Sequence, residues 1–129
     1  MLRAVMEGVS YSLKDCHDVL QAMGVRINEM MACGGGGKSR IWRQMLADMY
    51  GCEVRTIKAQ EGPALGAAIL AGVGAGIFPD VPTACNAFIE TATYCQPDGA
   101  AHAYYEKGHR LYQKLYRQLK ECYADLAML

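Results

Sequence analysis

MACGGGGKSRIWRQMLADMYGCEV, residues 31–54, indicates more about the architecture of this protein than any other part of its sequence. Residues 25–33 are mostly apolar and run directly into four glycines, which is typical of a buried strand that delivers the chain to a ligand-binding loop. Apolar side chains then recur at helical spacing from Lys38 to Tyr50, with Ser39 placed to cap the start and Gly51 just past the end. The pattern therefore predicts a strand, a glycine turn and a helix in succession.

The chain on either side of this segment continues as an alternation of strands and helices. Residues 53–57 alternate as a short strand does, and the order strand, helix, strand favours a parallel pairing of 53–57 with 25–33. The remaining pattern predicts helices over 2–23, 63–76 and 101–128, a turn-rich connection over 78–84, and an edge strand over 88–95. We expect the first and last helices to bury their apolar faces against the sheet. The predicted fold class is α/β, with a few-stranded sheet flanked by helices.

Composition and charge narrow the possible partners of the protein. Thirteen basic residues balance 13 acidic ones over 129 residues, so no excess of charge favours a nucleic acid or an anionic membrane as partner. The six cysteines are scattered without a C-x-x-C pair, which argues against a zinc site and a disulfide framework. The N-terminus reaches acidic Glu7 without a long apolar run, so neither a signal peptide nor a membrane span is predicted, and we expect a cytoplasmic protein.

The glycine run is the candidate binding site, because it combines free backbone N–H groups, close backbone approach and the start of a helix, a combination suited to an anion or a ribose phosphate. A Walker A loop fails at one required position, since its first glycine would fall on Ala32, and the spacing of a dinucleotide fingerprint is also absent. A merely flexible turn is the alternative. The candidate residues for binding such a group are Gly34, Gly35, Gly36, Gly37, Lys38 and Ser39.

Several conspicuous side chains have a structural interpretation beside the functional one. Ser39 can serve as a helix cap alone, and Lys38 can be a solvated lysine at a helix start. Trp42 is spaced with the apolar face of its helix, so we expect it in the core and not against a base. The three histidines, His17, His102 and His109, are interpreted as structural, and no metal-ligating set is predicted.

Two long motifs in this order resemble one known family. Residues 31–54, followed by EGPALGAAILAGVGAGIF at 61–78, resemble the adenosine-motif region of the FGGY carbohydrate kinases, whose xylulose kinase members read GGGAKSPLWRQ and then EGPALGAALLA. The resemblance extends upstream and downstream to cover essentially all of the chain. It departs from the family pattern at Gly37, where alanine is common and glycine is expected to loosen the loop, and at Arg40, where proline is frequent.

The resemblance implies an actin-like ATPase fold of the ribonuclease H type, in which two domains close over ATP and a sugar. Residues 1–129 would form the C-terminal portion of the second domain, on the nucleotide-binding side, without the N-terminal sugar-binding domain. The resemblance further implies that the backbone of Gly34–Gly36 approaches the ribose and α-phosphate and that Ser39 lies at the adenine edge. Glu61 would correspond to the family glutamate that opens the next helix, and its favoured role is a negative charge at the N-terminus of that helix. The aspartate base and the ligands of Mg²⁺ would lie before residue 1. Gly35 is expected to be the glycine at which a side chain disturbs ATP binding.

The function that this resemblance implies is a fragment of an ATP-dependent sugar kinase, with D-xylulose as substrate, ATP and ADP as ligands, and a homodimer as a possible assembly. Another sugar kinase of the family, acting on gluconate, fuculose, ribulose or glycerol, is the first alternative. A non-enzymatic actin-like nucleotide-binding module and a small interaction domain are the others.

Overall fold

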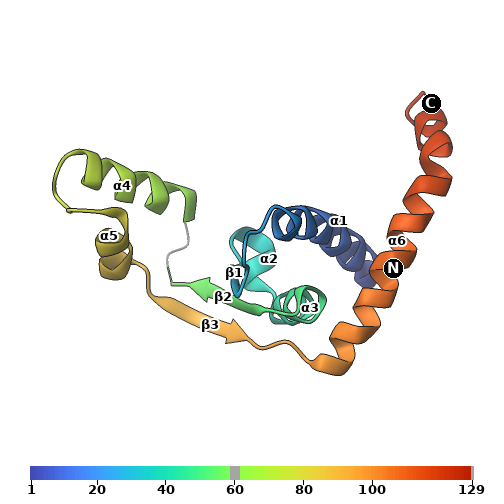
Figure 1. Cartoon of the computed structure of the whole chain (residues 1–129), viewed down its shortest axis with the longest axis horizontal. Coiled ribbons are helices and arrows are strands. Elements are labelled where there is room, and N and C mark those ends of the chain that lie inside the picture. Colours follow the sequence, from blue (N-terminus) through green and yellow to red (C-terminus); the bar gives the residue numbers. More distant parts are fainter. Residues whose placement is uncertain (59–61, 129) are drawn as a thin grey trace.

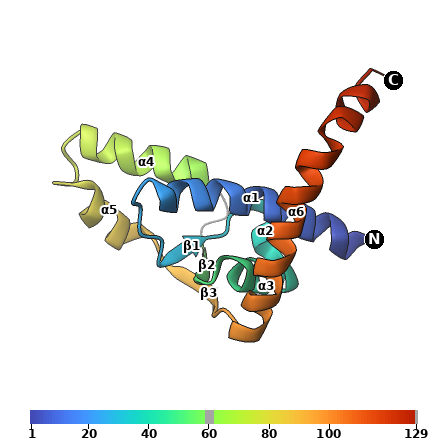
Figure 2. The ribbon, with the colours of Figure 1, turned by 45° about the vertical axis from the view of Figure 1, so that its right-hand side comes forward.

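The computed structural model describes residues 1–58 and 62–128, which form helices around a small sheet (Figure 1). In chain order the elements are α1 (Leu2–Ala22), β1 (Glu29–Met31), α2 (Gly34–Lys38), α3 (Arg40–Tyr50), β2 (Glu53–Ile57), α4 (Gly62–Gly74), α5 (Val81–Phe88), β3 (Thr91–Cys95) and α6 (Gly99–Leu126). Helices α4 and α5 lie beyond one end of the sheet, and α6 rises from the other end (Figures 1 and 2). No helix in these two ranges has the length and apolar character needed to cross a bilayer.

The sheet is mixed and has the strand order β1-β2-β3. Strand β1 pairs with β2 in parallel, from Glu29 opposite Glu53 to Met31 opposite Arg55, which confirms the predicted crossover. Strand β3 is antiparallel to β2 at the far edge, where an edge strand was expected. The strand predicted over 25–33 is shorter than expected, because only its last part lies opposite β2 while the residues after Gly24 connect it to α1.

The caps of the central helices follow the chemistry of single residues. The Ser39 hydroxyl accepts a hydrogen bond from the Trp42 N–H at 3.3 Å, and Gly51 ends α3 in the left-handed conformation with φ of 66°, so both predicted ends of α3 are confirmed. The prediction of a connection over residues 78–84 is wrong in part, because α5 begins at Val81. Its Asp80 carboxylate accepts from the Thr83 N–H, and the proline and aspartate that indicated a turn are equally good helix starters.

Helix α3 is the centre of the core. Its Met45, Met49 and Tyr50 pack with Cys52 and with Tyr105 from α6. On its other side, Ala47 packs against buried residues of β2 and β3. The position of α3 between the sheet and α6 therefore joins the strands to the helical end of the molecule.

The outer helices correct the expectation that both bury their apolar faces against the sheet. Helix α1 packs against α3 and α6, and the residues it buries are Ser10, Lys14 and His17, whereas Leu2, Val5 and Leu13 are exposed. Helix α6 buries Tyr105 and His109, while the large apolar residues further along it are exposed: Leu111, Leu115, Tyr116, Leu119, Tyr123 and Leu126. Helical spacing tells which residues share a face, but not which face meets the rest of the fold.

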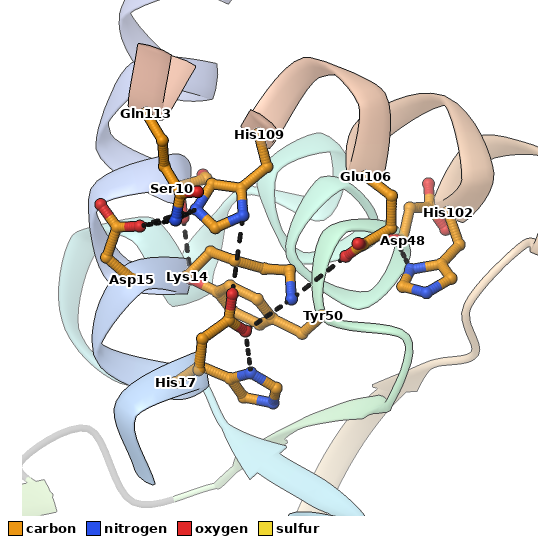
Figure 3. A network of polar contacts seen from close by, with 11 residues as sticks. Ser10, Lys14, Asp15, His17, Asp48, Tyr50, His102, Glu106, His109 and Gln113 are labelled. Atoms are coloured by element: carbon orange, nitrogen blue, oxygen red, sulfur yellow. Dashed lines mark hydrogen bonds and ion pairs between the residues drawn. The ribbon is translucent and has the colours of Figure 1, made fainter. Parts of the chain in front are cut away.

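Polar side chains hold α1 against α6 (Figure 3). Lys14 is buried and forms ion pairs with Asp18 on its own helix, at 2.8 Å, and with Glu106 of α6, at 3.2 Å. One helical turn further along α6, the Nε2 atom of His109 lies 2.8 Å from the Asp15 carboxylate. The acidic partner of His109 therefore comes from a distant segment and not from its own helix.

The other two histidines also lie in contacts between elements, as the structural interpretation expected. His17 stacks on the Tyr50 ring with centroids 5.3 Å apart, and its Nδ1 atom lies 3.2 Å from Asp18. The Nδ1 atom of His102 lies 2.8 Å from the Asp48 carbonyl oxygen. In the described ranges no three potential metal ligands come together.

The ion pairs raise the pKa of Lys14 and lower the pKa of Asp18. Burial alone would lower the pKa of Lys14, but hydrogen bonds to Asp18 and Glu106 outweigh it, and the pKa is raised. Burial would likewise raise the pKa of Asp18, but hydrogen bonds from Lys14 and His17 dominate and lower it. Both groups are therefore held in their charged forms at neutral pH.

Replacing Lys14 by methionine is expected to lower the free energy of unfolding by about 1–3 kcal/mol, because Asp18 and Glu106 would face each other without the cation between them. Denaturant unfolding of the variant measures the effect. Lys107 of α6 is exposed, and Lys107→Met is the control, expected to change stability by less than about 0.5 kcal/mol. Equal effects at Lys14 and Lys107 would show that the ion pairs do not stabilise the fold.

Candidate functional site

A cavity of about 270 Å³ opens where β1 and β2 end beside α2. The carboxyl ends of these two parallel strands lie at one edge of the sheet, and that edge is where the glycine run begins. The cavity is lined by Ala32, Cys33, Gly34, Gly37, Lys38, Arg43, Thr56, Ile57, Lys58 and Gly62. The position is the one at which open α/β sheets bind ligands.

The glycine run is a short helix and not the open turn predicted for it. Residues Gly34–Lys38 form α2, which follows an extended Cys33 and ends at an extended Ser39. Cys33 makes no side-chain hydrogen bond to the first turn of α2, and the four glycines have no side chains. One wall of the cavity is therefore made largely of backbone.

The glycines of α2 are not equivalent. Gly34 has φ of +69°, a conformation that residues with a side chain rarely adopt, and it lines the cavity. Gly35 has no atom within 4 Å of the place where a Cβ would stand, and it has no positive φ. A side chain at Gly35 would therefore meet no disallowed backbone angle, and that constraint belongs to Gly34.

The second pair of glycines supports close packing. A Cβ at Gly36 would lie 3.4 Å from the Trp42 ring, and one at Gly37 would lie 2.7 Å from the Ala32 carbonyl oxygen. Gly37 is buried. Glycine at position 37 was expected to loosen the loop, because relatives commonly have alanine there. In the structure it instead lets α2 approach the end of β1 more closely than an alanine would allow without a shift.

Three cationic side chains give the cavity its charge. Lys38 comes from the end of α2, Arg43 from α3, and Lys58 from the end of β2. Lys58 pairs with Glu90, and hydrogen bonding to that carboxylate raises the Lys58 pKa. No carboxylate is among the described residues that line the cavity. The site is thus suited to an anion.

Ser39 and Trp42 lie beside the cavity and not on its wall. Ser39 caps α3 through its hydroxyl, which confirms the cap, while its predicted place at the adenine edge is not tested. Trp42 packs against the core, and its Nε1 atom donates to the Ser10 hydroxyl at 2.9 Å. The structural interpretation of Trp42 is therefore confirmed. Glu61, the acidic residue expected to open α4, lies outside the described residues.

Three further residues line the cavity that were not predicted from the sequence: Arg43, Thr56 and Lys58. A signal for the last two was present, because the predicted parallel pairing places the end of 53–57 beside the glycine run. Arg43 had no such signal, since its helical spacing alone does not reveal that its side chain reaches back to α2. Its Nη1 atom donates to the Gly37 carbonyl oxygen at 2.5 Å.

Comparisons with known proteins point to one family. Residues 1–75 match the model of the FGGY family of carbohydrate kinases, C-terminal domain. The chain is 39% identical over 124 residues to a xylulose kinase of Staphylococcus epidermidis, covering 96% of this chain and 25% of that protein. It superposes on the crystal structure of a ligand-bound xylulose kinase from Lactobacillus acidophilus with a TM-score of 0.86 at 27% identity, covering 96% of this chain and 25% of the other.

A gluconate kinase from Lactobacillus acidophilus is similar in structure to nearly the same degree, with a TM-score of 0.84 at 26% identity and the same two coverages. The chain therefore spans about a quarter of the length of the relatives that it matches. The expected α/β fold agrees with these structures.

Proposed function

The chain belongs to the FGGY family of carbohydrate kinases, and on that premise we propose that it forms the nucleotide-binding, C-terminal part of an ATP-dependent sugar kinase. The observation that carries the proposal is the cavity beside α2, where a backbone wall and three cations converge within the segment that matches the family. The rest of the second domain and the sugar-binding domain are assigned to the remainder of a longer protein. The reaction proposed for that protein is phosphorylation of D-xylulose to xylulose 5-phosphate.

The residues of this chain would contribute to nucleotide binding and not to the chemical step. Lys38 and Lys58 place positive charge where a nucleotide phosphate would lie, and the backbone of Gly34 leaves room for close approach. Phosphoryl transfer also needs a base and Mg²⁺ to neutralise phosphate charge. The described residues supply no cluster of metal ligands, so we assign the base and the Mg²⁺ ligands to the rest of the protein.

Gluconate is the second candidate substrate, because the structural similarity to a gluconate kinase is nearly as high as that to a xylulose kinase. The cavity described here faces the nucleotide in this proposal, so it does not distinguish the two sugars.

We further propose a cytoplasmic enzyme, in keeping with the six cysteines, all of which are free. A homodimer stays a proposal.

Sugar-dependent release of ADP by the full-length protein tests the proposed function. Pentuloses, hexuloses, glycerol and gluconate are supplied in parallel with ATP, and D-xylulose is expected to give the highest kcat/KM. A higher kcat/KM for gluconate would retain the kinase and change its substrate. Absence of ADP release with every sugar would contradict the proposed function, and a non-enzymatic nucleotide-binding module would then be favoured.

A further inference from the structure

Arg43 adds a polar contact between α2 and α3, which also meet at the turn of Ser39 and where Gly36 lies against the Trp42 ring. It is the fourth residue of α3, and its side chain turns back so that Nη1 donates to the Gly37 carbonyl oxygen at 2.5 Å. Gly37 also packs against the Ala32 carbonyl oxygen, which is only 2.7 Å from where a Cβ would be. The end of α2 therefore contacts both the residue that follows β1 and the Arg43 guanidinium.

A helix as short as α2 needs such an external contact. It has five residues, four of them glycine, so it has almost no side chains with which to pack and a large conformational freedom to lose. The last carbonyl groups of a helix have no partner within it, and a guanidinium provides a charge-assisted donor for one of them. The Nε atom of Arg43 is buried and has no hydrogen-bond partner among residues 1–58 and 62–128. Within these ranges the guanidinium is therefore held by the hydrogen bond from Nη1 to the Gly37 carbonyl oxygen.

We propose that Arg43 is a positioning residue, which fixes α2 in the conformation that the nucleotide requires. The proposal rests on the proposed function, because it assigns to the α2 backbone the contacts with ATP. Arg43 acts through Gly37 and the α2 backbone, whereas Lys38 and Lys58 line the cavity without a side-chain hydrogen bond to α2 among the described contacts, and Lys58 pairs with Glu90. A direct phosphate contact by Arg43 is the competing explanation, and the two make different predictions for a nucleoside without phosphates.

Arg43→Met in the full-length kinase is expected to raise the KM for ATP at least about tenfold. If Arg43 positions α2, the inhibition constant of adenosine, measured as a competitor of ATP, rises by the same factor within about threefold, because the whole nucleotide site is displaced. The KM for the sugar stays unchanged. Arg43→Lys is expected to recover most of the affinity, since one ammonium donor suffices for one carbonyl acceptor.

Two results would overturn the proposal. If Arg43→Met weakens ATP binding but leaves adenosine inhibition unchanged, Arg43 contacts phosphate directly. If neither ligand is affected in a folded variant, Arg43 has no role in the nucleotide site. Should Arg43→Met fail to fold, the milder Arg43→Gln variant provides the same comparison of ATP with adenosine, and an equal loss for both ligands is again required.

A matched control lies on the same helix. Arg40 is exposed at the start of α3 and does not line the cavity, so Arg40→Met is expected to leave both constants within about twofold of the parent enzyme. The Gly34→Val variant distinguishes a failure of this proposal from a failure of the proposed function. If Gly34→Val raises the KM for ATP while Arg43→Met does not, only the role of Arg43 fails; if neither does, the assignment of the nucleotide to this cavity fails.

Discussion

Purified on its own, the 129-residue chain is expected to transfer phosphate from ATP to xylulose at least about 1,000-fold more slowly than the full-length kinase. The physical reason is the chemistry of the cavity. Its described lining residues include three cations and no carboxylate, so they offer neither a base for the sugar hydroxyl nor oxygen ligands for Mg²⁺. Cations alone bind a phosphate without removing the proton of the attacking hydroxyl.

Coupled detection of ADP, with and without xylulose, measures this rate under identical conditions for the chain and the full-length protein. Far-ultraviolet circular dichroism must show a strongly helical chain, as expected from its six helices in the described ranges, so that inactivity is not a consequence of unfolding. Xylulose-dependent turnover by the folded chain at a rate comparable to the full-length protein would contradict the division of function proposed here.

Gly34→Val in the full-length kinase is expected to raise the KM for ATP at least about tenfold, which corresponds to about 1.4 kcal/mol. Valine at φ of +69° is strained by its branched side chain, so the start of α2 must change conformation. The new side chain also stands at a wall of the cavity. The KM for the sugar should change little, because this cavity is assigned to the nucleotide.

Gly35→Val is the matched control for this prediction. It adds the same side chain one residue later, where the backbone has no positive φ and where a Cβ meets no atom within 4 Å. Its effect on the KM for ATP is expected to be smaller than that of Gly34→Val. Ser39→Ala is a separate test of the helix cap, and the loss of this cap is expected to lower the free energy of unfolding by roughly 1 kcal/mol. A larger effect at Gly35 than at Gly34 would show that the nucleotide approaches α2 over Gly35, as the sequence alone suggested.

Local chemistry accounts for the features that the sequence predicted well. Ser39 and Gly51 mark the ends of α3 because capping involves atoms only a few residues apart. The same local rules were ambiguous for Asp80, whose side chain suits a turn and a helix start equally, and α5 was missed for that reason. The parallel pairing of β1 with β2 was predictable because a single helix between two strands leaves one common topology.

The sequence by itself determined the family, the α/β alternation and the place of the glycine run between a strand and a helix, since each depends on residues that are neighbours along the chain. Only the tertiary structure decided that Gly34 carries the backbone constraint, that Gly37 packs against Ala32, and that Arg43 and Lys58 meet at the same cavity. Those features depend on contacts between segments that the sheet and α3 bring together. Spacing along a chain records which residues share a face, but the distance between two faces is set by the packing of the whole fold.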